Sequence, residues 1–243
     1  LPVVSTAYDV ARTYAGEYAA QVRFRKVESV GTLGSMNALV TIDAAVTIAD
    51  DAAAKAVTFT MQLCHVELSG QGTGLLAGSG LVTPDVVMTT TKLDPVAFAA
   101  ASAGGTVHWS VPELHGPIGW KWGGPTDSLP TSAGDPRVFD QDGDQSPGVT
   151  IQVTLAGTAT PVYVVQTERD TFSGTADGAG NLTASVADDT VQNVLGSSNP
   201  LLASAALTSE PDSNSADNVA RFVRIPAHLA CSDLVAQAGT LFP

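Results

Sequence analysis

Hydrophobic and polar residues alternate along four segments of the chain. In Tyr18–Val27 every second residue up to Phe24 is apolar, and the same period of two runs through Val57–Leu63, Thr106–Val111 and Val149–Leu155. Successive side chains of a β-strand point to opposite faces of a sheet. The pattern is rich in β-branched residues and therefore predicts strands with one buried face and one solvated face.

Weaker strand signals cover much of the remaining chain, with turn-forming residues such as Asp177–Gly180 between them. The further candidates are Leu39–Ile48, Asp85–Thr91, Val162–Arg169, Thr171–Ala176, Asn181–Ala187, Thr190–Leu195 and Val219–Ile225. About ten short strands without helical patterns between them predict an all-β fold, either a lipocalin-like antiparallel β-barrel or a sandwich. We favour the barrel, because closure removes the exposed edges of the sheet. Residues 1–243 are expected to form one β domain.

Two short helices are expected beside the strands. Asp94 and Pro95 precede an apolar run that ends at Ala101, in the manner of an N-cap and a first-turn proline before a helix. Ser232–Ala238 predicts a second helix that stops at Gly239. Between the two helices, residues 112–148 are rich in glycine and proline and predict a long irregular loop. Such loops in a compact domain are usually functional or tied down.

The composition excludes several classes of protein. The 243 residues are 44% hydrophobic and 14% charged, which is too apolar for a disordered chain. With 11 Lys and Arg against 24 Asp and Glu, the net charge is −13, which argues against a nucleic-acid partner or an anionic membrane surface. Glycine, proline and polar residues interrupt every long uncharged run, so no membrane span is expected. The chain opens at Leu1 without a methionine, as expected if a targeting peptide has been removed or the end has been trimmed.

The two cysteines, Cys64 and Cys231, stand far apart in the sequence and belong to no CxxC motif. Zinc-ribbon and thioredoxin-like arrangements are therefore not indicated. We interpret the pair as a disulfide, with two buried free thiols as the alternative. A bridge that closes so long a loop restricts the unfolded chain by roughly 5 kcal/mol. It would also place the protein in an oxidising compartment such as the periplasm, the cell surface or the medium.

The clearest chemical signal is an acidic loop within the irregular region. Asp140, Asp142 and Asp144 are spaced two residues apart, and a glycine after the second allows the chain to curl so that the carboxylates converge. Calcium takes six to eight oxygen ligands, and a bound ion offsets the repulsion among the carboxylates. We therefore predict a calcium site formed by these three residues with Ser146 and Asp135. A solvated acidic turn is the alternative.

The loop resembles the first half of the calcium loops of EF-hand and thrombospondin-type proteins, through a DxDGD pattern that begins at Asp140. It departs from an EF-hand soon afterwards. Gln145 replaces the usual glycine, and Ile151 stands where the bidentate glutamate would be. A regulatory EF-hand is therefore excluded, whereas a static calcium loop is not. Asp127 or a backbone carbonyl is a further candidate to complete its coordination shell.

A longer run, from Asp135 through the loop to Thr150, resembles a segment of uncharacterised secreted proteins and lipoproteins of myxobacteria and related bacteria, which carry a DxDGDxxPG loop. The likeness extends to a Val-Val-Gln strand that ends at Gln166. It also includes an Arg-x-Pro sequence, ending at Pro226, that precedes Cys231. The resemblance implies an extracellular bacterial β protein and supplies no activity.

Trp120 and Trp122 lie in the irregular region and would point the same way in an extended chain. Paired indoles can stack on sugar rings, so a glycan is a candidate ligand. The other interpretation is that the rings are aromatic caps over one end of the barrel. The histidines form no metal-binding pair, and acidic residues are too numerous for a catalytic carboxylate pair to be assigned.

Together these features predict a non-catalytic, calcium-stabilised β protein that acts outside the cell as a structural or assembly subunit. Its partner would be a second copy of the chain or another surface protein. The apolar end Leu1–Val4 is expected to dock, either on a neighbouring subunit by strand addition or on its own domain. One alternative is a barrel that binds a small molecule or a glycan. Another is an extracellular polysaccharide hydrolase with its cleft in the tryptophan-rich region.

Overall fold

The computed structural model describes residues 6–243 apart from 77–80, 125, 156 and 213–214. The expectation that Leu1–Val4 docks lies outside the described residues. The helices are α1 (Ala7–Ala11), α2 (Asp85–Thr90), α3 (Pro200–Ala203) and α4 (Cys231–Leu241), with 3-10 turns at Arg12–Tyr14 and Gly74–Leu76. The strands are β1 (Gly16–Val30), β2 (Ser35–Asp51), β3 (Ala56–Gly72), β4 (Leu81–Val82), β5 (Val96–Ala97), β6 (Ala99–Ala103), β7 (Thr106–Ile118), β8 (Val149–Leu155), β9 (Thr158–Ala176), β10 (Leu182–Asp188), β11 (Val191–Ser197), β12 (Leu207–Pro211) and β13 (Val219–Ile225).

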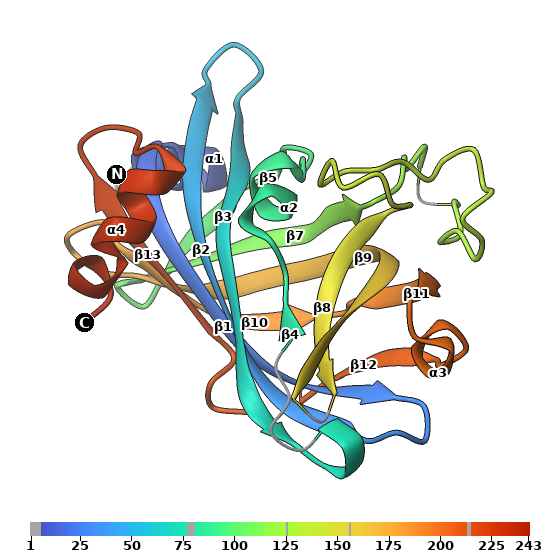
Figure 1. Ribbon diagram of the computed structural model, residues 1–243. Helices are drawn as coiled ribbons and strands as arrows, with labels where there is room; N and C mark the ends of the chain where they lie inside the picture. Colours follow the sequence, from blue (N-terminus) through green and yellow to red (C-terminus); the bar gives the residue numbers. More distant parts are fainter. Residues whose placement is uncertain (1–5, 77–80, 125, 156, 213–214) are drawn as a thin grey trace, which may run out of the picture.

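These strands form one 13-stranded antiparallel sheet, so the all-β prediction is confirmed. Its main path runs β4-β8-β9-β10-β13-β1-β2-β3-β5, with β6, β7, β11 and β12 pairing alongside. The sheet curls until β4 lies near β3 and β5 lies near β7. Figure 1 shows the resulting half-barrel, with the short helices around it. Of the two all-β alternatives, the chain therefore adopts the single curled sheet rather than two stacked sheets.

Strand β9 organises the curl, because its 19 residues pair with four neighbours. Its first part pairs with β8 on one side and β11 on the other, and its second part pairs with β7 and β10. Twist accumulates along a strand of this length and turns the sheet back on itself. The inner face of the sheet is consequently concave, and it collects the large apolar side chains.

Large aromatic side chains fill one end of this inner face. Phe222 meets the rings of Phe59, Phe172 and Trp109 edge-on, at centroid distances of 5.9, 5.7 and 5.3 Å. Burying each ring contributes about 2 kcal/mol, and edge-to-face contacts add about 1 kcal/mol each. The half-barrel is therefore packed solid at this end. Any internal space must lie further along the strands.

A second, smaller cluster lies on the outer face of β1, β2 and β3, beneath α4 (Figure 1). Small side chains of the sheet pack there against Leu234 of the helix and against Phe242, the residue that follows it. The disulfide Cys64–Cys231 joins β3 to the first turn of α4, with the two Cα atoms 5.0 Å apart. The predicted bridge is thus confirmed, and the free-thiol alternative is wrong. No helix among the described residues is long and apolar enough to cross a membrane.

Of the two predicted helices, one is present in the structure and the other is not. The helix predicted at Ser232–Ala238 is confirmed, and α4 continues through Gly239 to Leu241. The helix predicted from Asp94 to Ala101 is wrong. That segment forms β5 and β6, because β6 pairs residue by residue with β7, and Phe98 stacks on Trp109 at 5.7 Å. Sheet pairing and ring burial outweigh the helical propensity of the alanines.

The strand predicted at Asp85–Thr91 is also wrong, because most of it forms α2. A run of valine and threonine favours a strand by propensity alone. Here the hydroxyls of Thr89, Thr90 and Thr91 donate to backbone carbonyls one turn earlier, at 3.1, 2.6 and 2.7 Å. The accepting carbonyls belong to the first turn of the helix, so the three hydroxyls find their partners within α2 itself. The helix in turn buries Val87 against the sheet.

The irregular region is shorter than predicted at its start. Residues 112–118 belong to β7, so the loop between β7 and β8 spans 119–148. An isolated β-bridge between Trp120 and Val138 helps to hold its two arms together. A side chain on Gly119 would collide with Gly148, and a side chain on Gly148 would collide with the Val164 carbonyl of β9. The loop is therefore anchored at its base beside the first residue of β8.

Candidate functional site

The inner face of β1 changes character beyond its aromatic half. The period of two that buries Phe24 continues to Lys26 and Glu28, whose side chains also point inward and are only 5% and 6% exposed. Lys26 Nζ lies 2.9 Å from Glu28 Oε1. Charges this well buried are retained only when they are paired. A charged zone thus begins inside the half-barrel where the aromatic core ends.

Three more carboxyl groups face the same zone. Glu168 and Asp170 lie on β9, and Asp188 of β10 is the cross-strand neighbour of Asp170. Burial raises the pKa of Glu168 to about 7, and it raises the pKa of Asp170 and of Asp188 above their ordinary values. Burial alone would lower the pKa of Lys26, but the surrounding carboxylates outweigh it and raise that pKa. The zone therefore holds one cation among four acidic groups.

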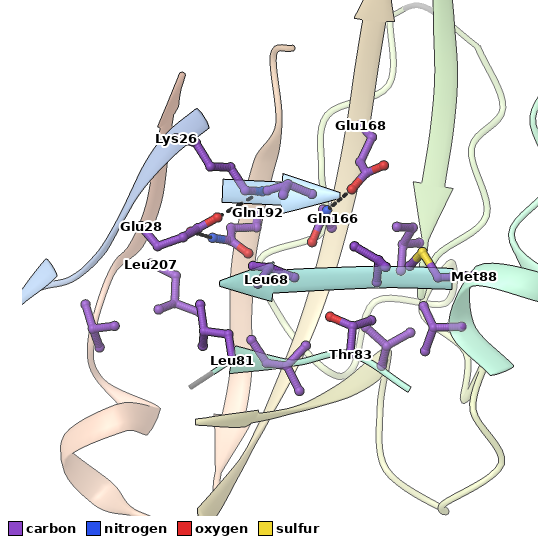
Figure 2. Close-up of a pocket in the computed structure, with 17 residues that line it drawn as sticks. Lys26, Glu28, Leu68, Leu81, Thr83, Met88, Gln166, Glu168, Gln192 and Leu207 are labelled. Atoms are coloured by element: carbon purple, nitrogen blue, oxygen red, sulfur yellow. Dashed lines mark hydrogen bonds and ion pairs between the residues drawn. The ribbon is translucent and has the colours of Figure 1, made fainter. Parts of the chain in front are cut away.

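A pocket of about 50 Å³ adjoins this zone (Figure 2). Its apolar wall comes from β3, β4, α2 and β8, and includes Leu68, Leu81, Met88 and Ile151. Its polar wall comes from β1, β9 and β11. Its residues are Lys26, Glu28, Gln166, Glu168 and Gln192, and Thr83 adds a hydroxyl on the opposite side, next to β4. An apolar surface thus faces a row of charged and amide groups.

The two glutamates of the pocket differ in how fully they are bonded. Besides its ion pair with Lys26, Glu28 accepts hydrogen bonds from Gln192 Nε2 at 3.0 Å and from the Ser209 hydroxyl at 3.2 Å. Glu168 accepts one bond, from Gln166 Nε2 at 2.8 Å to its Oε1. A carboxylate can accept about four. Glu168 is therefore the pocket carboxyl with the most unused bonding capacity within the described part of the chain.

The acidic loop forms a second candidate site. One carboxylate oxygen from each of Asp140, Asp142 and Asp144 lies within 4.8 Å of the others. Oxygens bound to one Ca²⁺ lie about 2.3–2.6 Å from it, so two on opposite sides are about 5 Å apart. The spacing therefore suits a shared ion, and the loop can hold a metal. The three carboxylates also accept backbone N–H groups, among them Gly143 to Asp140 at 2.7 Å and Thr150 to Asp142 at 2.7 Å.

The environments of these aspartates differ. Asp142 Oδ1 is buried and has no hydrogen-bond partner among the described residues. Burial is the main cause that raises the pKa of Asp142, with the neighbouring Asp144 carboxylate adding to it. The hydrogen bond from the Thr150 hydroxyl is the main cause that lowers the pKa of Asp144. Among the three aspartates, Asp142 is thus the one with a buried oxygen that accepts no hydrogen bond from a described residue.

Of the other candidate ligands, Asp135 and Asp127 lie apart from the three aspartates. Asp135 accepts hydrogen bonds from the Arg137 side chain at 2.7 and 3.0 Å, and these lower the pKa of Asp135 to about 2. Asp127 accepts a bond from the Gly123 N–H and lies 4.0 Å from the Arg137 guanidinium. Ser146 stays in the loop and donates its N–H to Asp144. Asp135 and Asp127 are therefore bonded around Arg137 and do not join the group of three aspartates.

The two tryptophans do not form a pair of exposed platforms. Trp120 is buried, donates its indole N–H to the Gln166 carbonyl at 3.0 Å, and has the Arg137 guanidinium over its ring. Trp122 stacks on His115, with ring centroids 4.3 Å apart. The Trp120 ring is buried and not open to a sugar, whereas Trp122 keeps partial exposure, so the two rings do not share one exposed face. The interpretation as aromatic caps fits Trp120.

Comparisons of the chain with protein-family models, with curated proteins and with solved structures find no match. The likeness to secreted myxobacterial proteins therefore stays a resemblance carried by the acidic loop.

Sequence reasoning missed the interior charged zone. The signal was present on β1, because the alternation that places Phe24 inward also places Lys26 and Glu28 inward. On β9, the same rule continues from Phe172 to Glu168. A charge in phase with a buried face breaks the apolar pattern, and such breaks are expected at functional sites. The residues of the zone are Lys26, Glu28, Glu168, Asp170 and Asp188.

Proposed function

We propose that the protein is a non-catalytic binding protein that holds a small molecule inside its half-barrel. The observation that carries this proposal is the pocket in which an apolar wall faces Glu168. Ligand sites in proteins commonly combine a mostly apolar lining with a few placed polar groups. Most of the described inner face is packed with aromatic and aliphatic side chains, whereas here charge and open space occur together.

The energetic cost of the charged zone supports the same proposal. Removing a charge from water costs several kcal/mol, and well-packed apolar residues are often as stable as a buried ion pair or more so. Asp170 Oδ1 and Asp188 Oδ2 are buried without hydrogen-bond partners among the residues described. A sheet with a purely structural role gains nothing from these groups. A binding role gives a reason for them to be there.

The proposal is tested by filling the pocket. Val66 lines it from β3, and a phenyl ring in its place (Val66→Phe) would occupy much of the space. Val82 on β4 is 60% exposed, so Val82→Phe is the matched control. Ligand-observed NMR with a library of small amphipathic compounds should give binders to the wild type and to the control but not to V66F. Binding that survives in V66F, or a library without binders, would contradict the proposal.

A second candidate function rests on the acidic loop. We propose Ca²⁺ as the ion for Asp140, Asp142 and Asp144, because hard carboxylate oxygens at this spacing suit it. The protein would then be a calcium-stabilised extracellular subunit, and the disulfide supports an oxidising compartment. Self-association stays part of this proposal.

Calorimetry separates this candidate from a solvated turn. The melting temperature should rise in Ca²⁺ and fall in chelator, and Asp142→Asn should abolish the difference. Gly178→Ala, in a loop far from the aspartates in the sequence, serves as a control of similar size. Light scattering on the same samples tests assembly. Equal melting temperatures in Ca²⁺ and in chelator would refute the calcium site. A monomer at all concentrations would refute the assembly role.

A further inference from the structure

The interior charged zone does not suit a metal ion. Among the described residues, the acidic loop is the place where three metal-ligating groups converge within 4.8 Å. The interior carboxyls are distributed along β1, β9 and β10 instead. A point charge cannot reach all of them. A group that fits this zone must therefore be held by one carboxyl and by the apolar wall.

The sign of the charge limits the ligand further. Lys26 is already paired with Glu28 at 2.9 Å, so it offers no free cation to an anionic ligand. An anion in the pocket would also meet Glu28 and Glu168, with Asp170 and Asp188 close behind. A neutral molecule would leave Glu168 with its bond from Gln166 and without a positive partner of its own. A cation with a hydrogen-bond donor is the group that the zone lacks.

On these grounds, and resting on the binding function proposed above, we infer that the pocket binds a small organic ammonium ion. Its nitrogen donates to the Glu168 carboxylate, and its carbon chain lies against Leu68, Met88 and Ile151. Figure 2 shows Glu168 beside Gln166 on the polar side of the pocket, with Leu68 and Met88 on the apolar side. Charge-assisted hydrogen bonds of this kind are about twice as strong as neutral ones.

The size of the pocket sets the length of the ligand. A cavity of about 150 Å³ takes up benzene, and this pocket measures about 50 Å³. The part of the ligand that enters is therefore the ammonium group with its first carbons. A short alkylammonium such as n-propylammonium is a suitable probe.

Proton binding makes the affinity depend on pH. Among the described residues, the charged groups that act on Glu168 are Lys26 and Glu28 from β1 and Asp188 from β10, and Glu168 in turn acts on Asp170 of its own strand. On β7, the residue opposite Glu168 is Gly116, which brings no charge. Burial raises the pKa of Glu168 to about 7, so below that value the ligand must displace a proton. Affinity for the amine should then fall about tenfold for each pH unit below 7.

The test is a titration of the ¹⁵N-labelled protein with n-propylammonium, n-propanol and propionate at pH 8 and 0.15 M salt. We expect the amine to shift β9 amides and to bind at least tenfold more tightly than the other two probes. Glu168→Gln should reduce amine affinity at least tenfold. Glu67→Gln, which removes an exposed carboxyl of β3 next to the pocket residue Leu68, should leave the affinity unchanged.

The outcomes distinguish the ammonium assignment from the broader proposal that the pocket binds a small molecule. Propanol or propionate binding as tightly as the amine would overturn the ammonium assignment and leave the binding function standing. Absence of binding by all three probes would overturn the ammonium assignment, while the compound library decides the broader function. Amine binding that survives in V66F would place the site on the acidic surface and refute the assignment. Circular dichroism of E168Q and V66F shows whether each variant is folded, and loss of affinity counts only in a folded variant. If E168Q does not fold, the V66F result and the pH dependence of the wild type decide.

Discussion

The Glu168→Gln substitution should change how the free energy of unfolding depends on pH. Glutamine has nearly the same shape as glutamate. Its carbonyl oxygen can still accept the hydrogen bond from Gln166, which is 2.8 Å long in the wild type. It cannot ionise, so the substitution removes the titration and little else. The variant therefore removes one buried carboxyl, and its effect on Asp170, while keeping the shape of the side chain.

The sign and size of this change in the free energy of unfolding follow from the pKa values of Glu168 in the unfolded and folded states. Its ordinary pKa is 4.5, and burial raises the pKa in the folded protein to about 7. Between these pH values the folded state holds a proton that the unfolded chain has lost, so stability falls as the pH rises. The difference corresponds to about 3 kcal/mol. This figure is an upper bound, because the Glu168 side chain keeps partial contact with solvent.

Urea denaturation followed by tryptophan fluorescence, at several pH values between 4.5 and 8.5, measures this effect. Relative to the wild type, E168Q should gain up to about 3 kcal/mol between the lowest and the highest pH. Asp170 and Asp188 remain in both proteins, but the Glu168 carboxylate helps to raise the pKa of Asp170, so E168Q also weakens the pH dependence that Asp170 contributes, in the same direction. Glu67→Gln, at an exposed position, should follow the wild-type profile. Parallel profiles for E168Q and the wild type would refute the reasoning that burial controls this carboxyl.

Three other predictions concern the disulfide and the loop. Serine at both Cys64 and Cys231 should lower the free energy of unfolding in urea by up to roughly 5 kcal/mol, because the bridge spans 167 positions; an unchanged midpoint would contradict this. Gln141→Ala should cost about 1–3 kcal/mol and lower the melting temperature, because its amide bonds both to α2 and to the base of the loop; an unchanged melting temperature would show that these bonds do not hold the loop. Gly148→Ala should cost well over 2 kcal/mol, since its Cβ would lie 2.2 Å from a β9 carbonyl oxygen. Gly143→Ala, with a similar positive φ but open space around it, should cost about 1–2 kcal/mol in the same assay; equal losses would exclude the clash.

Much of the fold was predictable because period two is a local signal. Strands β8 and β13 match their predicted bounds, Val149–Leu155 and Val219–Ile225. The errors occur where contacts with a neighbouring strand or helix, rather than local sequence, decide the structure of a segment. The alanines of β6 become a strand because β7 offers a complete ladder, and the valines and threonines of α2 become a helix that packs on β3. No local pattern records which neighbour is available.

The candidate sites show the same division. The Asp140 loop was recognisable from spacing alone, because its ligand atoms come from one short segment. Asp135 was assigned to that loop from proximity in sequence, but the Arg137 side chain pairs with it instead. The interior zone joins Lys26 to Glu168 across more than a hundred residues. Only the curl of the sheet brings them together, although the inward phase of each was already present in its strand.

The two candidate sites share one wall. Gln141 stands between two of the loop aspartates and donates to the Val87 carbonyl of α2, and Val87 lines the pocket. Asp142 accepts the N–H of Thr150 on β8, and the residues on either side of Thr150 line the pocket as well. An ion that binds the ordered loop stabilises this wall by mass action. The same wall is needed to hold a ligand against Glu168. If the ion makes ligand binding more favourable by a given free energy, the ligand makes ion binding more favourable by the same amount.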